Sequence, residues 1–453
     1  MKVVVSGCGK IGFEIIKNLV NEGHDVVAVD NNPAVIEEIT NVFDVMGVTG
    51  NSADCETLGE AGIENAQLFV AVTGSDEMNM LSCYIAKCMG VEHTIARIRN
   101  PEYNDNSLNF MRQNLGISLS VNPELLTAKE IFNILKFPSA IKVENFSKRN
   151  IEMVEIRIPS DSALDGFAIS KMREKYKAEY LICAVTRGEE SFIPDGSFVL
   201  KSGDIIGIIA APTEIQKLLR NLGILKKQVS SVMILGASKT AYYLSKMLIA
   251  SGIEVKIIEQ NIERCDEVST ELGGKSIIIH GNGAEQELLL EEGIGAVDGF
   301  VALTGMDEEN MVVSMFASTQ GVKKVLSKFN REEMCVLANK LGLDSIVTPK
   351  SVNADILVRY ARAIENSMGS NVETLYKILD GKAEALEFNV RSDFAQVNIP
   401  LKEMKFKSNI LIAGIMRGKK TIIPSGDDVI MLNDKVIVVA ANERFNDLSD
   451  IIK

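Results

Sequence analysis

The chain has 453 residues, a formal net charge of −13 and no tryptophan. Its length predicts several domains. Its acidic balance argues against binding to nucleic acid or directly to an anionic membrane, because both need many Lys and Arg side chains facing phosphates. Seven scattered cysteines without a CxxC pair predict reduced thiols, and three isolated histidines predict no metal site. No signal peptide or bilayer-length apolar stretch is recognisable, so we expect a cytoplasmic chain without membrane insertion.

The first 138 residues alternate short apolar runs with helical stretches. In chain order these are KVVVSG, FEIIKNLVNEG, DVVAVD, AVIEEITNVF, DVMGVTG, AQLFVAVTG and NMLSCYIAKCMG. Such alternation predicts a parallel sheet covered by helices on both faces. NPELLTAKEIFNILKF adds a helix, with Pro123 in its first turn and Pro138 after its end.

The pattern changes in residues 139–226. IEMVEIRIP alternates apolar and polar residues, as a half-buried strand does. The stretch from LICAVTRG to GDIIGIIAA reads as strands joined by glycine-containing turns, at Arg187-Gly188, Asp195-Gly196 and Ser202-Gly203. We therefore expect a small α+β lobe here.

The chain is a duplication. Gly7 recurs as Gly236, 229 residues later, and GNSADCETLGEAGI from Gly50 recurs as GNGAEQELLLEEGI from Gly281. FVAVTGSDEMNM matches FVALTGMDEENM, and FIPDGSFVLKSGD matches IIPSGDDVIMLND. The predicted fold class is α/β, with tandem Rossmann-like N-lobes of parallel strands, each followed by a small α+β C-lobe. The predicted bounds are 1–138 and 139–226 for the first half, and 229–365 and 366–453 for the second.

A glycine loop, Gly7-x-Gly9-x-x-Gly12, follows the first predicted strand and opens the first helix. Gly7 allows the tight turn, Gly9 lets the backbone approach a pyrophosphate, and Gly12 lets helix and strand pack closely. The phosphate would meet the free N–H groups and partial positive charge of the helix N-terminus.

Asp30 lies at the end of the second predicted strand, 23 residues after Gly7. Its carboxylate could accept hydrogen bonds from ribose hydroxyls and would repel a 2′-phosphate, which favours NAD(H), ADP or ATP over NADP. The alternative is that Asp30 only starts the turn in DNNP.

Further candidates surround this loop. Lys10 lies within it, and Arg97 and Arg99 lie two residues apart on a predicted strand, so that both would face one side. They could supply a local positive potential, or they could form ordinary surface salt bridges. Thr73 and Gly74 end the fourth predicted strand, at the sheet edge where open α/β sheets bind ligands.

The second copy of the loop departs from the first. Gly236 is kept, but Ser238 stands at the middle glycine and Ala241 at the third. Alanine is tolerated there, whereas serine places a side chain where pyrophosphate would press. The remaining counterparts are Lys239, Glu259, Thr304 and Lys328. The second site is therefore a weaker site, a mononucleotide site or an empty structural copy.

No catalytic residues are predicted. A dehydrogenase usually needs an acid or base beside the nicotinamide, but neither C-lobe contains a histidine or a recognisable catalytic grouping. Two small lobes of one kind are more typical of assembly or sensing modules.

The ordered motifs GCGKIG, AVD, GNSADCETL, AVTGSDEMN, ARIRNPEY and FIPDGSFVLKSGD, in duplicate, resemble the TrkA-type subunits of Trk potassium-uptake systems. Each half is similar to an RCK (KTN) domain with its TrkA-C lobe. The resemblance implies a cytosolic protein that binds NAD(H) and adenine nucleotides. It also implies a ring, typically a tetramer for a two-repeat chain, beneath a TrkH- or TrkG-type membrane protein.

Nucleotide contacts follow from the same resemblance. In the first half they fall on Gly7, Cys8, Gly9, Lys10, Ile11, Asp30, Thr73 and Arg97. In the second half they fall on Gly236, Ala237, Ser238, Lys239, Thr240, Glu259 and Thr304, with Lys328 in place of the arginine. Many family members keep more glycine in the second loop, so this departure weakens the second assignment.

The resulting hypothesis is a regulatory subunit whose ring changes shape when nucleotide binds, with NAD(H) at the first site and ADP or ATP at either. Two alternatives remain open on the sequence alone. One is a soluble NAD-dependent oxidoreductase, and the other is a nucleotide-binding regulator of another cation transporter.

Overall fold

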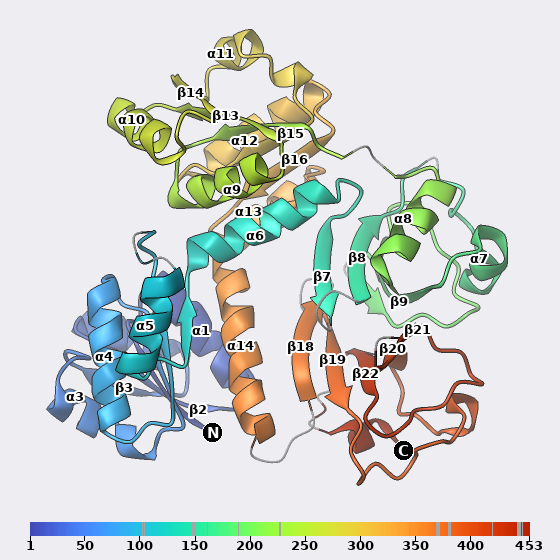
Figure 1. Cartoon of the computed structure of the whole chain (residues 1–453), viewed down its shortest axis with the longest axis horizontal. Helices are drawn as coiled ribbons and strands as arrows, with labels where there is room; N and C mark the ends of the chain where they lie inside the picture. Colours follow the sequence, from blue (N-terminus) through green and yellow to red (C-terminus); the bar gives the residue numbers. More distant parts are fainter. Residues whose placement is uncertain are drawn as a thin grey trace.

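The computed structural model describes residues 1–453 except 102, 104, 147–150, 161, 189, 226–227, 344, 368–371, 379–381, 419, 442–444 and 446. The described residues form four sheets, two of six strands and two of five. The six-stranded sheets are the N-lobes and the five-stranded sheets are the C-lobes (Figure 1). The predicted fold class is confirmed.

The first N-lobe is a parallel sheet in the order β3-β2-β1-β4-β5-β6. Its strands are β1 (Lys2–Ser6), β2 (Asp25–Asp30), β3 (Met46–Thr49), β4 (Leu68–Ala71), β5 (His93–Arg97) and β6 (Leu119–Val121). Its helices are α1 (Lys10–Asn21), α2 (Pro33–Val42), α3 (Cys55–Glu60), α4 (Asp76–Cys88) and α5 (Asp105–Leu115). The central strands β1 and β4 are buried at every residue but Lys2, because helices cover both faces of the sheet. The strand order reverses between β1 and β4, where open α/β sheets bind ligands.

The second N-lobe repeats this sheet in the order β14-β13-β12-β15-β16-β17. Its strands are β12 (Ser231–Leu235), β13 (Glu254–Glu259), β14 (Ile277–His280), β15 (Gly299–Ala302), β16 (Lys324–Lys328) and β17 (Ile346–Val347). Its helices are α9 (Lys239–Ala250), α10 (Ile262–Glu271), α11 (Gln286–Glu291), α12 (Asp307–Thr319) and α13 (Glu332–Lys340).

The C-lobes are antiparallel, in the orders β10-β9-β11-β8-β7 and β18-β19-β22-β20-β21. The first contains β7 (Lys142–Phe146), β8 (Ile151–Arg157), β9 (Tyr180–Arg187), β10 (Glu190–Phe192), β11 (Ile205–Ala210), α7 (Ile169–Tyr176) and α8 (Pro212–Asn221). The second contains β18 (Val372–Ile378), β19 (Ala383–Asn389), β20 (Ile410–Arg417), β21 (Lys420–Ile422) and β22 (Lys435–Ala441). The duplication is imperfect here, because the described part of the second C-lobe has short 3-10 helices, Leu401–Glu403 and Leu448–Ile451, in place of α7 and α8.

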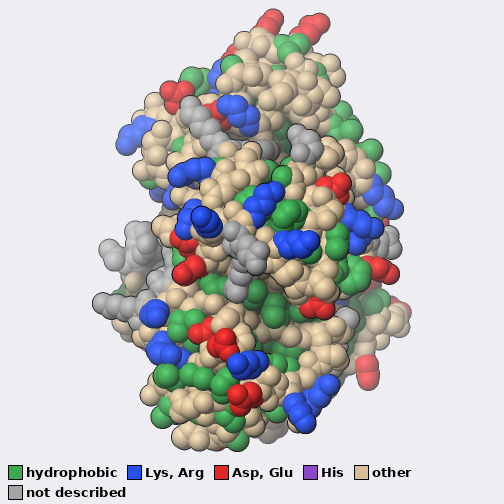
Figure 2. All heavy atoms as spheres, turned by 90° about the vertical axis from the view of Figure 1, so that its right-hand side faces the viewer, with side chains coloured by type: hydrophobic (Ala, Val, Ile, Leu, Met, Phe, Trp, Pro, Cys, Tyr) green, Lys and Arg blue, Asp and Glu red, His purple; other side chains and the backbone are tan. Residues whose placement is uncertain are grey.

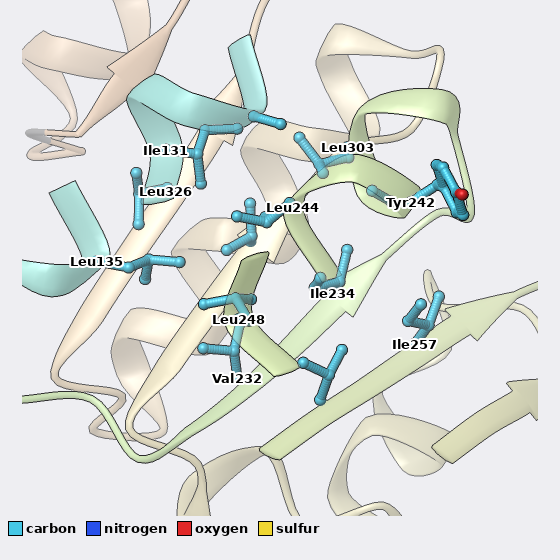
Figure 3. Close-up of a cluster of buried hydrophobic side chains, with 14 of the residues drawn as sticks. Ile131, Leu135, Val232, Ile234, Tyr242, Leu244, Leu248, Ile257, Leu303 and Leu326 are labelled. Atoms are coloured by element: carbon cyan, nitrogen blue, oxygen red, sulfur yellow. The ribbon is translucent and has the colours of Figure 1, made fainter. Parts of the chain in front are cut away.

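The last helix of each N-lobe packs on the other N-lobe. In α6 (Pro123–Lys136), Ala128, Ile131 and Leu135 join a buried cluster with Val232, Leu248 and other residues of the second N-lobe (Figure 3). In α14 (Pro349–Ser367), Leu357, Ala361 and Ile364 join the core of the first N-lobe, beside α1 (Figure 1). The predicted helix at Pro123 is thus present and has a counterpart at Pro349, but each completes the hydrophobic core of the opposite half.

The two C-lobe sheets pack face to face. Phe146 of β7 meets Tyr376 of β18 with ring centroids 4.3 Å apart, and alanines such as Ala184 and Ala385 lie in the same cluster. Figure 2 views the molecule from the side on which the C-lobes lie, where basic and acidic side chains are interspersed. The exchanged helices and the paired C-lobes therefore hold the two halves in one body.

Candidate nucleotide-binding site

The glycine loop between β1 and α1 has the geometry that its sequence predicts. Gly7 has φ +88°, and a Cβ there would lie 2.6 Å from the Thr73 nitrogen. A Cβ on Gly12 would lie 2.0 Å from the Gly7 oxygen, so this position brings helix and loop together. A Cβ on Gly9 would meet no protein atom within 4 Å. Gly9 therefore faces open space that a ligand can occupy.

The N-terminus of α1 opens toward this space. Gly9 is its N-cap and supplies no side-chain acceptor, and the first turn contains no acidic residue. Lys10, the first helical residue, is exposed. The unbonded N–H groups, the helix dipole and this ammonium together favour an anion here.

Asp30 joins the loop to the second strand. Its Oδ2 accepts the Cys8 N–H at 2.7 Å and its Oδ1 accepts the Asn32 N–H at 2.9 Å. Asp30 thus starts a turn, as the alternative interpretation had it, and also borders the cavity. Cys8 itself lies beneath the loop, where burial, together with the charge of Asp30, raises the pKa of its thiol to about 12.

A cavity of about 660 Å³ lies beside the loop. The predicted residues that line it are Gly7, Gly9, Lys10, Ile11, Asp30, Thr73, Gly74 and Arg97. Cys8 and Gly12 are not among the lining residues. The Nε of Arg97 is buried without a hydrogen-bond partner, and burial, followed by repulsion from Arg99, lowers its pKa. A half-buried guanidinium whose Nε is buried and unsatisfied at the cavity wall favours an anionic ligand.

Arg99 has a different role from Arg97. Strand β5 ends at Arg97, so the expected strand containing both arginines is too long and Arg99 lies beyond it. The Arg99 guanidinium donates to the Gly74 oxygen at 2.8 Å and lies 3.8 Å from Asp76 and 3.9 Å from Glu124. These contacts match the salt-bridge alternative, while its charge still acts on Arg97.

The cavity also includes residues that were not predicted to contact the nucleotide. Asn31, Gly50, Asn51, Ser52, Val72, Ser75 and Met78 come from the first N-lobe. The repeated GNSAD motif after β3 was a usable signal, because it follows a strand at the carboxyl edge of the sheet. Asn330, Pro349 and Lys350 come from the second half, and only the exchange of helices brings them here.

In the second glycine loop a side chain caps the N-terminus of the helix that follows, α9. Gly236 has φ +89°, like Gly7, but Ser238 Oγ accepts the Ala241 N–H at 3.3 Å. The serine hydroxyl therefore satisfies one N–H group in the first turn of α9. In α1 the N-cap is Gly9, which has no side chain to accept such a hydrogen bond. Arg264 adds a brace, since its Nε donates to the Ala237 oxygen at 2.8 Å.

The other second-copy candidates keep the pseudo-symmetric geometry. Glu259 accepts the Ala237 and Asn261 N–H groups, and Thr304 donates to Asn310. Thr240 is buried and Lys239 is exposed. The ammonium of Lys328, where Arg97 stands in the first half, donates to the Leu303 oxygen at 3.3 Å. Its pKa is lowered by burial, which Asp307 and Glu124 partly offset.

Two Rossmann-like lobes with attached antiparallel lobes define a tandem protein of the dinucleotide-fold class. Sequence profiles agree at the level of each lobe. The TrkA-N domain matches residues 3–123 and 232–349, and the TrkA-C domain matches residues 153–223 and 386–453. The chain belongs to the TrkA family.

Relatives extend over the full length. The "Trk system potassium uptake protein TrkA homolog" of Archaeoglobus fulgidus is 31% identical, with 100% of both chains covered. The "Trk system potassium uptake protein TrkA" of Vibrio alginolyticus is 30% identical, over 100% of this chain and 98% of its own. Among solved structures, "GsuK Channel" has a TM-score of 0.64 at 16% identity, over 98% of this chain and 77% of that one. "GsuK channel bound to NAD" has a TM-score of 0.62 at 15% identity, over 97% and 77%. These two structures share the fold.

Two features are absent from the described residues. None of their helices has both the length and the hydropathy to cross a bilayer. Within the same part of the chain, no cluster of three or more Asp, Glu, His or Cys side chains is arranged to hold a metal ion.

Proposed function

We propose that this chain is a nucleotide-sensing regulatory subunit of a Trk-type potassium-uptake system. Full-length relatives are named as TrkA proteins of such systems. The observation on which the proposal rests is the cavity beside α1, where a free helix N-terminus, Lys10, Arg97 and Asp30 converge. These groups suit the diphosphate and ribose of NAD(H), ADP or ATP.

The assembly follows from the same proposal. The chain forms a ring, a homotetramer, in the cytoplasm and attaches to the inner face of the membrane through a TrkH- or TrkG-type partner. It acts by binding without turnover. Nucleotide favours one ring shape only by its differential affinity for the two shapes, and a tenfold difference shifts the equilibrium by about 1.4 kcal/mol per site.

NAD(H) is assigned to the cavity of the first half, and ADP or ATP to either half. The structural neighbour "GsuK channel bound to NAD" supports a dinucleotide in this fold. In the first half, Asp30 would accept from ribose hydroxyls and α1 would hold the diphosphate. In the second half, Ser238 narrows the approach, which favours a smaller or weaker ligand.

Calorimetry with NAD+, NADH, ADP and ATP tests the proposal. We expect binding by the wild-type chain and at least tenfold weaker binding by Asp30→Ala, because that side chain holds both loop and ribose. Glu259→Ala is the matched variant in the second half and should leave NAD+ binding in place. Absence of binding by the wild-type chain contradicts the proposal, as does oxidation or reduction of NAD(H) with a metabolite. Co-purification with a cation transporter of another type would contradict the assigned partner.

A further inference from the structure

The cavity of the first half is completed by the second half. Asn330 follows β16, and Pro349 and Lys350 begin α14, yet all three line the cavity beside α1. Pro349 and Lys350 reach it because α14 packs on the first N-lobe through Leu357 and its neighbours. A ligand in this cavity can therefore contact both N-lobes at once.

Lys350 brings a positive charge with no partner of its own. It is half-buried, and no carboxylate or carbonyl among the described residues accepts a hydrogen bond from its ammonium. The lining then contains three cations, Lys10, Arg97 and Lys350, against the single carboxylate of Asp30. In a chain of net charge −13, this local excess favours a ligand with more negative charge than the α1 N-terminus alone needs.

The N-terminus of α14 adds to this field. At the matching place before α6, Asn122 caps the helix by accepting the Leu125 N–H at 2.9 Å. Before α14, the Thr348 hydroxyl instead contacts the Cys335 thiol at 3.5 Å. Within the described residues no side chain caps α14, so its positive end stays available beside Lys350.

The pseudo-symmetric position has the opposite charge. Pro123 and Glu124 begin α6 as Pro349 and Lys350 begin α14. Glu124 lies 3.9 Å from Arg99, and its charge acts on Arg97 of the first half as well as on Lys328 of the second. The second residue of the exchanged helix is thus a cation in α14 and an anion in α6, and the cation lines the first cavity.

We propose that Lys350 binds the outermost phosphate of a nucleoside triphosphate in the first cavity, beyond the phosphates held at α1, and so selects triphosphate over diphosphate. This inference rests on the proposed function. Arg97, with its unpartnered Nε, faces the same ligand. A triphosphate then bridges both N-lobes, whereas a diphosphate contacts chiefly the first.

Calorimetry on the full chain with ATP and with ADP tests the assignment. Lys350→Met should reduce the ratio of ATP to ADP affinity about tenfold, the size expected for one lost charge-assisted hydrogen bond. Lys350→Arg keeps the positive charge and should therefore keep the ATP-to-ADP affinity ratio of the wild-type chain. Lys340→Met removes an exposed lysine from the same lobe, outside the cavity, and should leave the ratio unchanged.

A double variant tests whether the effect of Lys350→Met on the ATP-to-ADP ratio arises in the first cavity. Gly9→Asp places a carboxylate in the open space at α1, and in that background Lys350→Met should have no further effect. An unchanged ATP-to-ADP ratio in Lys350→Met overturns the inference while wild-type binding upholds the proposed function. Persistence of the effect in the Gly9→Asp background also overturns it. Failure of the wild-type chain to bind any nucleotide removes the proposed function itself.

Discussion

Arg362 of α14 donates from both Nε and a terminal nitrogen to one carboxylate oxygen of Glu22, the C-cap residue that follows α1. Its guanidinium also lies 3.4 Å from Glu384 of β19. The N-terminus of α1 borders the candidate cavity, so this ion pair connects the far end of the same helix to α14 and to a C-lobe. Both side chains of the pair are almost fully buried, at 10% and 6% exposure.

We predict that Glu22→Gln lowers the free energy of unfolding by about 2–4 kcal/mol, because it leaves a buried guanidinium with a weaker partner. Lys17→Met is the control. Lys17 lies on α1 and pairs with Glu332 of α13. The two side chains are 36% and 74% exposed, so the loss of unfolding free energy should stay below about 1 kcal/mol. The midpoint of urea unfolding measures both. Equal losses would show that burial of the Glu22 pair does not matter.

We expect Gly9→Ser to weaken NAD+ and ADP binding at the first site by at least about tenfold without loss of stability. The new hydroxyl would cap α1 as Ser238 caps α9, and it would occupy the approach of the diphosphate. Thermal unfolding and calorimetry report the two quantities.

The reciprocal change, Ser238→Gly, should free the Ala241 N–H and strengthen nucleotide binding in the second half. Calorimetric stoichiometry and affinity would show it. Undiminished binding by Gly9→Ser would contradict the assignment of the phosphate to this helix end.

Gly12→Ala should destabilise the first N-lobe by about 1–3 kcal/mol, because its Cβ would lie 2.0 Å from the Gly7 oxygen and α1 must move away from the loop. Gly59→Ala in α3 is the control, since its Cβ meets no atom within 4 Å and alanine favours the helix. That variant should be neutral or more stable in urea. A neutral Gly12→Ala would refute the close approach.

The carboxyl group of Glu130 lines another cavity, of about 940 Å³, which is separate from both glycine loops and lies between the lobes. Burial raises the pKa of Glu130 on α6 to about 7, with Glu144 and Asp355 adding to the shift and Lys142 and Arg359 opposing it. Between an unfolded pKa near 4.5 and this value, the folded state holds a proton that the unfolded state releases. Stability should therefore fall as pH rises through that window.

Glu130→Gln tests this dependence. The full shift corresponds to about 3 kcal/mol, and because Glu130 borders the cavity and is partly exposed to it, we expect about 1–2 kcal/mol. The raised pKa of Lys142 acts only above its ordinary range near 10.5, outside the window. Urea midpoints at pH 5, 6, 7 and 8 should fall for the wild-type chain and stay flatter for the variant. Parallel profiles would show that Glu130 is not the responsible group.

Much of the site followed from local sequence. Gly7, Gly9 and Gly12 each have the geometry that their spacing predicts, because a tight turn and a close helix approach are demands on the backbone within a few residues. Asp30 is the last residue of β2, and the register of the sheet places it beside the loop. Arg99 was misplaced because β5 ends two residues before it, where Asp76 accepts the Arg99 and Asn100 N–H groups.

The sequence by itself determined the duplicated lobes, the parallel and antiparallel sheets and the phosphate-facing loop, since periodicity, glycine positions and turn residues act locally. Only the tertiary structure decided that α6 and α14 exchange places. Their sequence patterns predict apolar stripes but not the lobe on which each stripe packs, because that choice depends on contacts between segments far apart in the chain. That exchange brings Lys350 to the first cavity, whereas the corresponding residue of α6 is Glu124, which lies beside Arg99.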